Sequence, residues 1–186
     1  MGAVRPFNPV KPFAGVLVSD PQWVPQVKAQ LITLFGPIDH QTGILRFEST
    51  DYYSEEMGDA LDRMLFSFEH LVEADGLERV KLETNRIENE LGAVSKGVPR
   101  PVNLDPGYIE QSKVILFSTK NFYHRAYLGN GIFAEVTMHF KKNANQFFPW
   151  TYPDYKSPPS QEFFDRMRQI YRSQLENRSS PPAVQV

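Results

Sequence analysis

Most of the side chains suited to chemistry fall in one stretch of the chain, between residues 103 and 135. It reads NLDPGYIEQSKVILFSTKNFYHRAYLGNGIFAE. Its charged members stand among Gly, Pro and aromatic residues, and Gly and Pro are typical of turns. Acidic, basic and imidazole groups on turn-rich backbone are typical of binding and catalytic sites. The groups best suited to such a site are Asp105, Lys120, His124, Arg125 and Glu135.

The last part of this stretch predicts a β-hairpin that turns through residues 129–131. A two-residue loop places His124 and Glu135 on the same face of the sheet, either opposite or diagonal to each other. A carboxylate beside an imidazole is a usable acid/base pair, so Glu135 and His124 are candidate catalytic residues. A three-residue loop shifts the register, and Arg125 then faces Glu135 in a structural salt bridge.

A second candidate is the polar flank of a predicted helix, where Lys81, Asn85 and Glu88 follow at spacings of four and three. These spacings put the three side chains in one stripe beside the apolar face. The stripe is a candidate ligand-binding surface if it looks into a cleft between helix and sheet. The alternative is a solvated flank with Lys–Glu pairs.

Two further groups flank buried strands. Asn103 and Asp105 surround a predicted Pro-Gly turn, and Lys120 follows a strand at 113–118, where open sheets often bind ligands. Together with Lys81 and Arg125, Lys120 is predicted to hold an anionic group. The alternative is that Asp105 only caps the turn and Lys120 is solvated.

Several familiar catalytic and nucleotide-binding signatures are absent. The chain has no GxxxxGK[ST] phosphate loop, no GxGxxG, no HExxH and no GxSxG elbow. The chain has no cysteine, which excludes disulfides, thiolate nucleophiles and zinc–thiolate sites. The four histidines lack zinc-like spacing, so a metal site would need carboxylates, and Glu135 and His124 are then metal-binding candidates as well. The sequence identifies neither a metal nor a cofactor.

Composition limits the remaining classes. A chain of 186 residues is about one domain long, and its net charge of -2 argues against broad nucleic-acid binding. No apolar stretch approaches the roughly 20 residues of a membrane span, and the basic, proline-broken start lacks a signal-peptide core. We therefore expect a soluble, cytoplasmic protein. The sequence does not indicate an oligomeric state.

The elements that position these residues indicate an α+β fold. Strands are predicted at 13–19, 44–48, 63–68, 102–104 and 113–118, and helices at 21–35 and 75–91. Asp75 and Glu78 form a capping-box-like pair at the start of the second helix. The order is that of a ferredoxin-like βαββαβ layer extended by the antiparallel hairpin, with a C-terminal amphipathic helix from about residue 160. One domain is expected at 12–176, between flexible tails at 1–11 and 177–186.

Several long blocks of the sequence resemble the bacterial domain-of-unknown-function family 4416. They are FGPIDHQTGILRFESTDYYSEEMG, KLETNRIENE, NLDPGYI, STKNFYHRAYLGNGIFAEVT and PWTYPDY, and the similarity spans residues 12–171. Some members carry a GTP-binding label, which the resemblance alone does not extend to this chain, because its TKN at 119–121 is not the guanine-reading NKxD pattern. The matching blocks are rich in polar residues, including Asp51, Tyr52 and Tyr53, which favours a ligand site.

The sequence therefore predicts a polar pocket for a small anionic or phosphorylated ligand, such as a nucleotide, with hydrolysis or group transfer as an open possibility. Whether the protein is an enzyme stays open at this point. The alternative is a non-catalytic interaction module that binds protein or single-stranded RNA through Tyr123, Tyr127 and Phe133. Exposed rings beside Lys141 and Lys142 would favour RNA. The aromatic loop with Trp150, Tyr152 and Tyr155 is expected to form a lid over the core.

Overall fold

The structure is a computed structural model, and it describes residues 2–3, 6–47, 54–142 and 144–179. The loop with Asp51, Tyr52 and Tyr53 and the chain after Ser179 lie outside the described residues. The strands are β1 Lys11–Val18, β2 Ile38–Gln41, β3 Leu45–Phe47, β4 Leu61–Phe68, β5 Val102–Ile109, β6 Lys113–Ser118, β7 Arg125–Gly129, β8 Ile132–Lys141 and β9 Ala144–Phe147. The α-helices are α1 Val24–Phe35, α2 Ser54–Met57, α3 Val80–Val94 and α4 Pro158–Ser179. Short 3-10 helices lie at Pro21–Trp23, Leu77–Arg79 and Pro153–Lys156.

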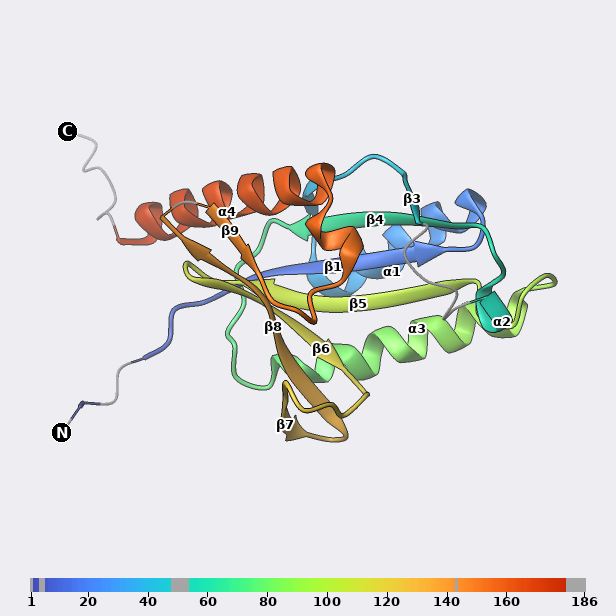
Figure 1. Cartoon of the computed structure of the whole chain (residues 1–186), viewed down its shortest axis with the longest axis horizontal. Coiled ribbons are helices and arrows are strands. Elements are labelled where there is room, and N and C mark those ends of the chain that lie inside the picture. Colours follow the sequence, from blue (N-terminus) through green and yellow to red (C-terminus); the bar gives the residue numbers. More distant parts are fainter. Residues whose placement is uncertain (1, 4–5, 48–53, 143, 180–186) are drawn as a thin grey trace.

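The nine strands form one antiparallel sheet in the order β2-β4-β1-β5-β6-β8-β7, with β3 on β4 and β9 on β8. Helices α1 and α3 cover one face through a core that includes Phe66, Ile87 and Leu104. Helix α4 covers the opposite face, where Phe164 and Tyr171 are buried (Figure 1). The α+β class predicted from the sequence is confirmed, and so is the C-terminal amphipathic helix.

Local patterns account for most of these elements. Met64, Phe66 and Phe68 alternate along β4 and all reach the core under α1 and α3, as predicted for a strand. Ile87 and Leu91 are buried on α3, as the helical stripe predicts. The predicted capping box is wrong, because Gly76 is the N-cap of the 3-10 helix that precedes α3, with φ of 75° and no side-chain cap. The edge strands β2 and β9 were not predicted.

The predicted Pro-Gly turn is also wrong: residues 105–108 lie inside strand β5. β5 pairs with β1 along its whole length but with β6 only from Gly107 to Ile109. Pro106 therefore sits where β6 has not yet joined, and proline is tolerated at such an unpaired edge. Gly107 is required where the two strands meet, because a Cβ there would lie 2.1 Å from the Ile115 carbonyl oxygen.

Helix α4 is anchored to the chain start by one buried phenol. The Tyr171 hydroxyl donates to the Pro9 carbonyl oxygen at 2.9 Å, and the side chain is fully buried. Burial, and then the charge of Glu110, raises the pKa of Tyr171 to about 12. The folded state therefore holds this proton more tightly than the unfolded state does.

We predict a loss of stability at alkaline pH that depends on Tyr171. Because its pKa is raised on folding, its contribution is complete below about pH 10 and falls as the pH rises towards 12, by up to about 1.4 kcal/mol per pH unit. The variant Tyr171→Phe should be about 1 kcal/mol less stable at pH 7 through the lost hydrogen bond. Urea unfolding from pH 7 to 11.5 measures both, and parallel curves for the two proteins above pH 10 would contradict the prediction.

Candidate functional site

The candidate residues gather around the gap between the first half of β5 and the end of β6. In an antiparallel ladder the backbone groups of alternate residues point to the same side, and those of Leu104 point towards this gap. Two side chains of α3 take the place of the missing strand: Glu88 accepts from the Leu104 N–H at 2.8 Å, and Lys81 Nζ donates to the Leu104 carbonyl at 2.6 Å. Lys81 and Glu88 are themselves 3.5 Å apart and buried.

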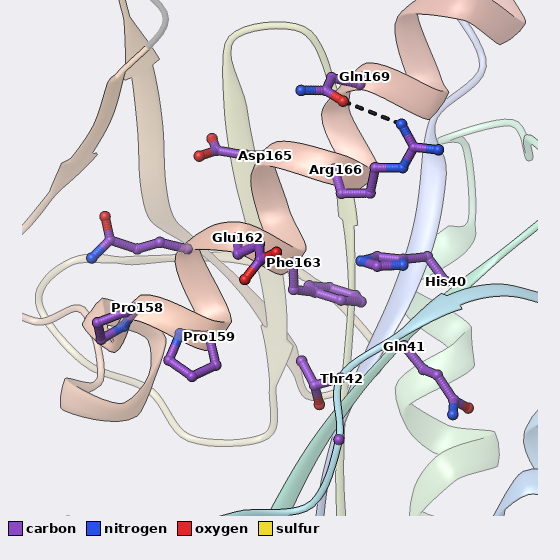
Figure 2. Close-up of a pocket in the computed structure, with 12 residues that line it drawn as sticks. His40, Gln41, Thr42, Pro158, Pro159, Glu162, Phe163, Asp165, Arg166 and Gln169 are labelled. Atoms are coloured by element: carbon purple, nitrogen blue, oxygen red, sulfur yellow. Dashed lines mark hydrogen bonds between the residues drawn. The ribbon is translucent and has the colours of Figure 1, made fainter.

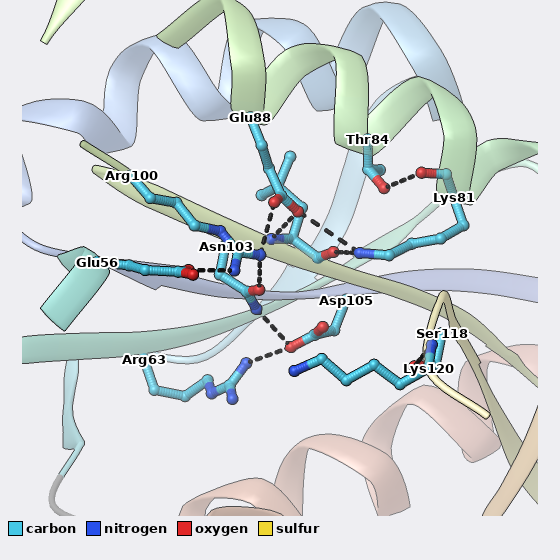
Figure 3. Close-up of polar contacts among 11 residues, drawn as sticks. Glu56, Arg63, Lys81, Thr84, Glu88, Arg100, Asn103, Asp105, Ser118 and Lys120 are labelled. Atoms are coloured by element: carbon cyan, nitrogen blue, oxygen red, sulfur yellow. Dashed lines mark hydrogen bonds and ion pairs between the residues drawn. The ribbon is translucent and has the colours of Figure 1, made fainter. Parts of the chain in front are cut away.

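A chain of polar contacts leads from Glu88 onto the sheet face that α4 covers (Figure 3). Arg100 donates to Glu88 at 2.7 Å and also to the side-chain oxygen of Asn103. The Asn103 amide then donates to Asp105 at 2.8 Å, and Arg63 of β4 lies 3.5 Å from the same carboxylate. The Asp105 side chain is 26% exposed, so this chain ends at the surface.

Arg63 lies deep under the 3-10 helix before α4. It forms an ion pair with Asp154 at 2.8 Å, and its guanidinium faces the ring of Tyr155 at 5.5 Å. Gly15 of β1 makes room for both groups, because a Cβ there would lie 2.5 Å from the Tyr155 oxygen and 3.0 Å from Arg63 Nη1. Burial raises the pKa of Tyr155 well above its usual value, so the phenol stays protonated.

The hairpin of β7 and β8 brings both predicted partners to Glu135. Asn130 and Gly131 have positive φ of 54° and 76°, as in a type I′ turn. A bulge between Tyr127 and Gly129 then shifts the register, so that Arg125 lies opposite Glu135. Glu135 accepts from Arg125 Nε at 2.9 Å and contacts His124 Nε2 at 3.0 Å. The turn is therefore one of the two-residue loops that the sequence left open, whereas the pairing of Arg125 with Glu135 is the one expected of a three-residue loop.

Glu135 is 2% exposed, and both of its oxygens are engaged. The oxygen that does not meet Arg125 and His124 accepts from the Thr137 hydroxyl at 2.8 Å. Residues two apart in a strand share a face, which allows this contact. A second bulge follows here: the register passes from Val114↔Met138 to Ile115↔Val136, which leaves Thr137 as the extra residue. This contact pattern makes Glu135 an anchor for its neighbours and leaves it no face that a substrate can reach.

His124 is held between Glu135 and the aromatic loop. Its ring stacks on Trp150 at 4.8 Å, and Trp150 stacks on Phe148 at 4.7 Å. Its Nδ1 atom is buried and has no hydrogen-bond partner among the described residues. The aromatic loop therefore packs on His124, in line with the lid expected from the sequence, while Tyr155 fills the core below α4.

Arg125 joins four segments of the chain. Besides Glu135, it donates to the Ser118 hydroxyl at 3.1 Å, to the Lys120 carbonyl at 2.9 Å and to the Tyr152 hydroxyl at 3.3 Å. Burial lowers the pKa of Arg125, but the hydrogen bond and the charge of Glu135 outweigh it, and the pKa is raised overall. Arg125 is therefore a permanently charged clamp.

Tyr152 links the two networks. Burial and then the charge of Asp105 raise the pKa of Tyr152, although Arg125 acts in the opposite direction. Its side chain is still 40% exposed. The exposed Lys120 side chain runs towards Asp105 and Arg63 in Figure 3. We call Lys120, Tyr152 and Asp105 the polar rim, because they are the surface-accessible groups on which both networks end.

The structure thus brings Asn103, Asp105, Lys120, His124, Arg125 and Glu135 to one region of the sheet. Lys81 and Glu88 lie at its inner end, where both side chains are hydrogen-bonded to the backbone of Leu104. Asn85 is half-buried on α3 and makes no side-chain hydrogen bond to another described residue. Arg63, Arg100, Tyr152 and Asp154 were not among the predicted site residues. Arg63 carried the one usable signal, a charged side chain within the apolar strand RMLFSF.

We predict that Lys81→Met destabilises the fold by about 3–5 kcal/mol, because it leaves the Glu88 charge and the Leu104 carbonyl buried without their partner. Urea denaturation monitored by circular dichroism measures the change. The exposed Lys96 gives a matched control, and Lys96→Met should stay within about 0.5 kcal/mol of the parent protein. Equal stability of the two variants would show that Lys81 does not support the β5 edge.

The described residues contain no group of three or more His, Asp or Glu side chains placed to hold a metal ion. Nor does any described helix have the length and apolar character needed to cross a membrane.

Comparison with known proteins identifies one relationship. The sequence model of a family described as "Domain of unknown function (DUF4416)" matches residues 8–171. No curated protein and no solved structure matches the chain.

Proposed function

We propose a function for this chain, which belongs to the DUF4416 family; the description of that family states no function. The protein binds a small ligand that carries an anionic group, such as a phosphoryl group, at the polar rim. Lys120 supplies the charge, the Tyr152 hydroxyl supplies a second donor, and Asp105 accepts from the rest of the ligand. A nucleotide or another phosphorylated metabolite has both kinds of group.

The observation that carries the proposal is the clamp at Arg125. One guanidinium, neutralised by buried Glu135, holds the Lys120 peptide on one side and the Tyr152 hydroxyl on the other. Because the Tyr152 oxygen accepts this hydrogen bond, its own proton is available to a ligand. The Tyr152 hydroxyl and the backbone that carries the Lys120 side chain are therefore held relative to each other before a ligand arrives, which lowers the entropic cost of binding.

The energetic cost of buried charge also supports a functional role for these networks. Buried ion pairs such as Glu135–Arg125 and Lys81–Glu88 cost desolvation energy, and apolar packing can often replace such pairs without loss of stability. Around the polar rim the carboxylates and cations nearly balance, so the region as a whole does not attract anions strongly. Recognition then depends on the local placement of Lys120 and on hydrogen bonds of charged groups.

The catalytic roles predicted for His124 and Glu135 stay predictions. Their contacts favour positioning, because neither group reaches the rim directly. Hydrolysis or group transfer at the rim would require Asp105 or Tyr152 to move the proton. The predicted anion contacts of Lys81 and Arg125 are indirect in this proposal, since Lys81 supports β5 and Arg125 orients the rim.

We also infer a ferredoxin-like arrangement for the part that runs β1–α1–β2–β4–α3–β5, in which β2 takes the place of the strand predicted at 44–48. The spatial order β2-β4-β1-β5, the antiparallel pairs and the placement of α1 and α3 on one face support it. The split between β5 and β6 is then the junction between this unit and the added strands.

A second candidate function is an interaction module, and one observation favours it. Phe122, Tyr123 and Tyr127 are 56%, 79% and 64% exposed at the β7 edge. The cations that would favour RNA lie elsewhere: Lys141 is at the far end of β8 from Phe133, roughly 26 Å away along the strand. The exposed rings are therefore better suited to a protein partner than to RNA.

The proposal predicts ligand-dependent thermal stabilisation that requires the rim. In a screen of nucleotides, phosphorylated metabolites and inorganic phosphate, a ligand at 100 times its dissociation constant should raise Tm by roughly 5–10 °C. Lys120→Ala should weaken binding roughly tenfold or more and Tyr152→Phe roughly tenfold, because each removes one hydrogen bond to a charged group. Titration calorimetry gives the affinities.

The control is Lys141→Ala, which removes an exposed cation from the same sheet at a distance from the rim. It should bind like the parent protein. A ligand that binds the Lys120 and Tyr152 variants unchanged would place the site elsewhere, and no response from a folded sample would refute the anion site.

A further inference from the structure

A groove of about 800 Å³ lies at the opposite end of the sheet, between β2 and the first turns of α4 (Figure 2). Its strand side is formed by His40, Gln41, Thr42 and Gly43. Its helix side is formed by the exposed flank of α4, including Glu162, Asp165, Arg166 and Gln169. None of these residues belongs to the polar rim or to the networks behind it.

The strand side of the groove is the edge of the sheet. Within the described part of the chain, β2 pairs with β4 alone. The Thr42 N–H donates to the Leu65 carbonyl at 3.0 Å, and Gln41 lies opposite Phe66. In an antiparallel ladder the residue next to such a bonded pair points its N–H and C=O away from the partner strand. The backbone groups of Gln41 therefore face outward, where a further strand would add.

A bulge in β2 directs a ring towards the helix. The register passes from Ile38↔Phe68 to His40↔Ser67, so Asp39 is the extra residue. Asp39 is held beneath by the Ser67 hydroxyl at 2.6 Å and by the Lys11 ammonium. His40 then projects towards α4 and stacks on Phe163 at 5.3 Å with nearly parallel rings. The pair forms a rigid floor between the polar side chains of the groove.

The helix side carries net negative charge. Glu162 and Asp165 are exposed on it, while the one cation of this flank, Arg166, donates to Gln169 at 3.3 Å. The flank cannot rotate, because Phe163, Phe164 and Met167 on the inner side of α4 are buried in the core. An open strand edge thus faces a fixed acidic helix flank.

We propose that this groove binds an extended peptide segment that carries basic side chains. The peptide adds as a strand to β2, so that its main chain bonds the outward groups of Gln41. Side chains of the added strand alternate between its two faces, so every second side chain of the peptide faces α4. Lys or Arg residues of the peptide on that face reach Glu162 and Asp165, and an apolar residue on the same face covers the His40–Phe163 pair.

Charge separates this occupant from the two alternatives. A second copy of the chain would bring its own Glu162 and Asp165 to the groove, and like charges oppose that contact. A small apolar molecule does not satisfy the amide and carboxylate groups on the walls of the groove. A basic peptide satisfies both the backbone edge and the acidic flank.

Selection from a phage-displayed library of random linear peptides tests the proposal on the full chain. The expected result is enrichment of sequences with Lys or Arg at alternate positions. Synthetic peptides from the selection should bind the double variant E162K/D165K roughly tenfold more weakly, because the change replaces attraction by repulsion. Both positions are exposed, so the variant should fold.

A backbone variant tests the strand pairing separately. Gln41→Pro removes the outward N–H but no hydrogen bond to β4, and it should abolish binding, whereas Gln41→Ala keeps the N–H and should bind normally. If Gln41→Pro does not fold, protection of the Gln41 amide from hydrogen exchange on peptide binding replaces it. No enrichment, enrichment of acidic peptides, or binding unchanged in E162K/D165K would each overturn the proposal.

Discussion

The half of β5 that has no pairing with β6 is the constraint on which the rest of the site depends. Leu104 points a buried N–H and a buried carbonyl at a gap where no strand lies, and such groups must find partners. Proline at 106 removes one further donor from the same side, and α3 supplies Glu88 and Lys81 for the others. Both side chains must reach the backbone of the same residue, Leu104. The position of α3 on the sheet is therefore fixed by hydrogen bonding as well as by packing.

The Lys81–Glu88 pair places charge in the interior, and a series of polar contacts connects this buried charge to the surface. Glu88 pairs with Lys81 and Arg100, Arg100 orders Asn103, and Asn103 orders Asp105. Each step satisfies one group and directs the next towards solvent. The Glu135 network follows the same rule from the other side of the gap, with Arg125 as its outermost member. Tyr152 and Lys120 lie where the two sets of charges meet.

The sequence predicted the elements with strong periodicity and most of the charged site residues, but not the contacts among them. Period-two and helical patterns are local, so β4 and α3 were predicted from their own residues. The DPGY segment was misread because Pro and Gly usually mark turns, and the strand interpretation required knowing that β6 joins only at Gly107. Edge strand β2 carries too little apolar pattern to be recognised.

The partnership of Glu135 with both Arg125 and His124 was open for a related reason. Loop length alone gives one register, and the bulge before Gly129 changes it by one residue. Residues such as Arg100 and Tyr152 enter the site from loops, and a loop position becomes meaningful only when the tertiary structure is known. Charged residues inside apolar strands, such as Arg63, are the exception, since burial forces them to have partners.

The same structural device appears at both ends of the sheet. Thr137 in β8 and Asp39 in β2 are each the extra residue of a bulge, and each is hydrogen-bonded to a polar partner on the face that α4 covers. A regular strand would turn one of two consecutive side chains to the opposite face. The bulge in β8 instead keeps Thr137, beside Glu135, on the same face as Met138, and the bulge in β2 leaves His40 directed at Phe163 while Asp39 bonds below it. Both bulges thereby place polar groups on the α4 face, while the face under α1 and α3 keeps an apolar core beside the buried Lys81–Glu88 pair. A bulge requires an interrupted ladder, so it is least costly where pairing ends. Asp39 lies in the edge strand β2, and Thr137 lies between the part of β8 that pairs with β7 and the part that pairs with β9.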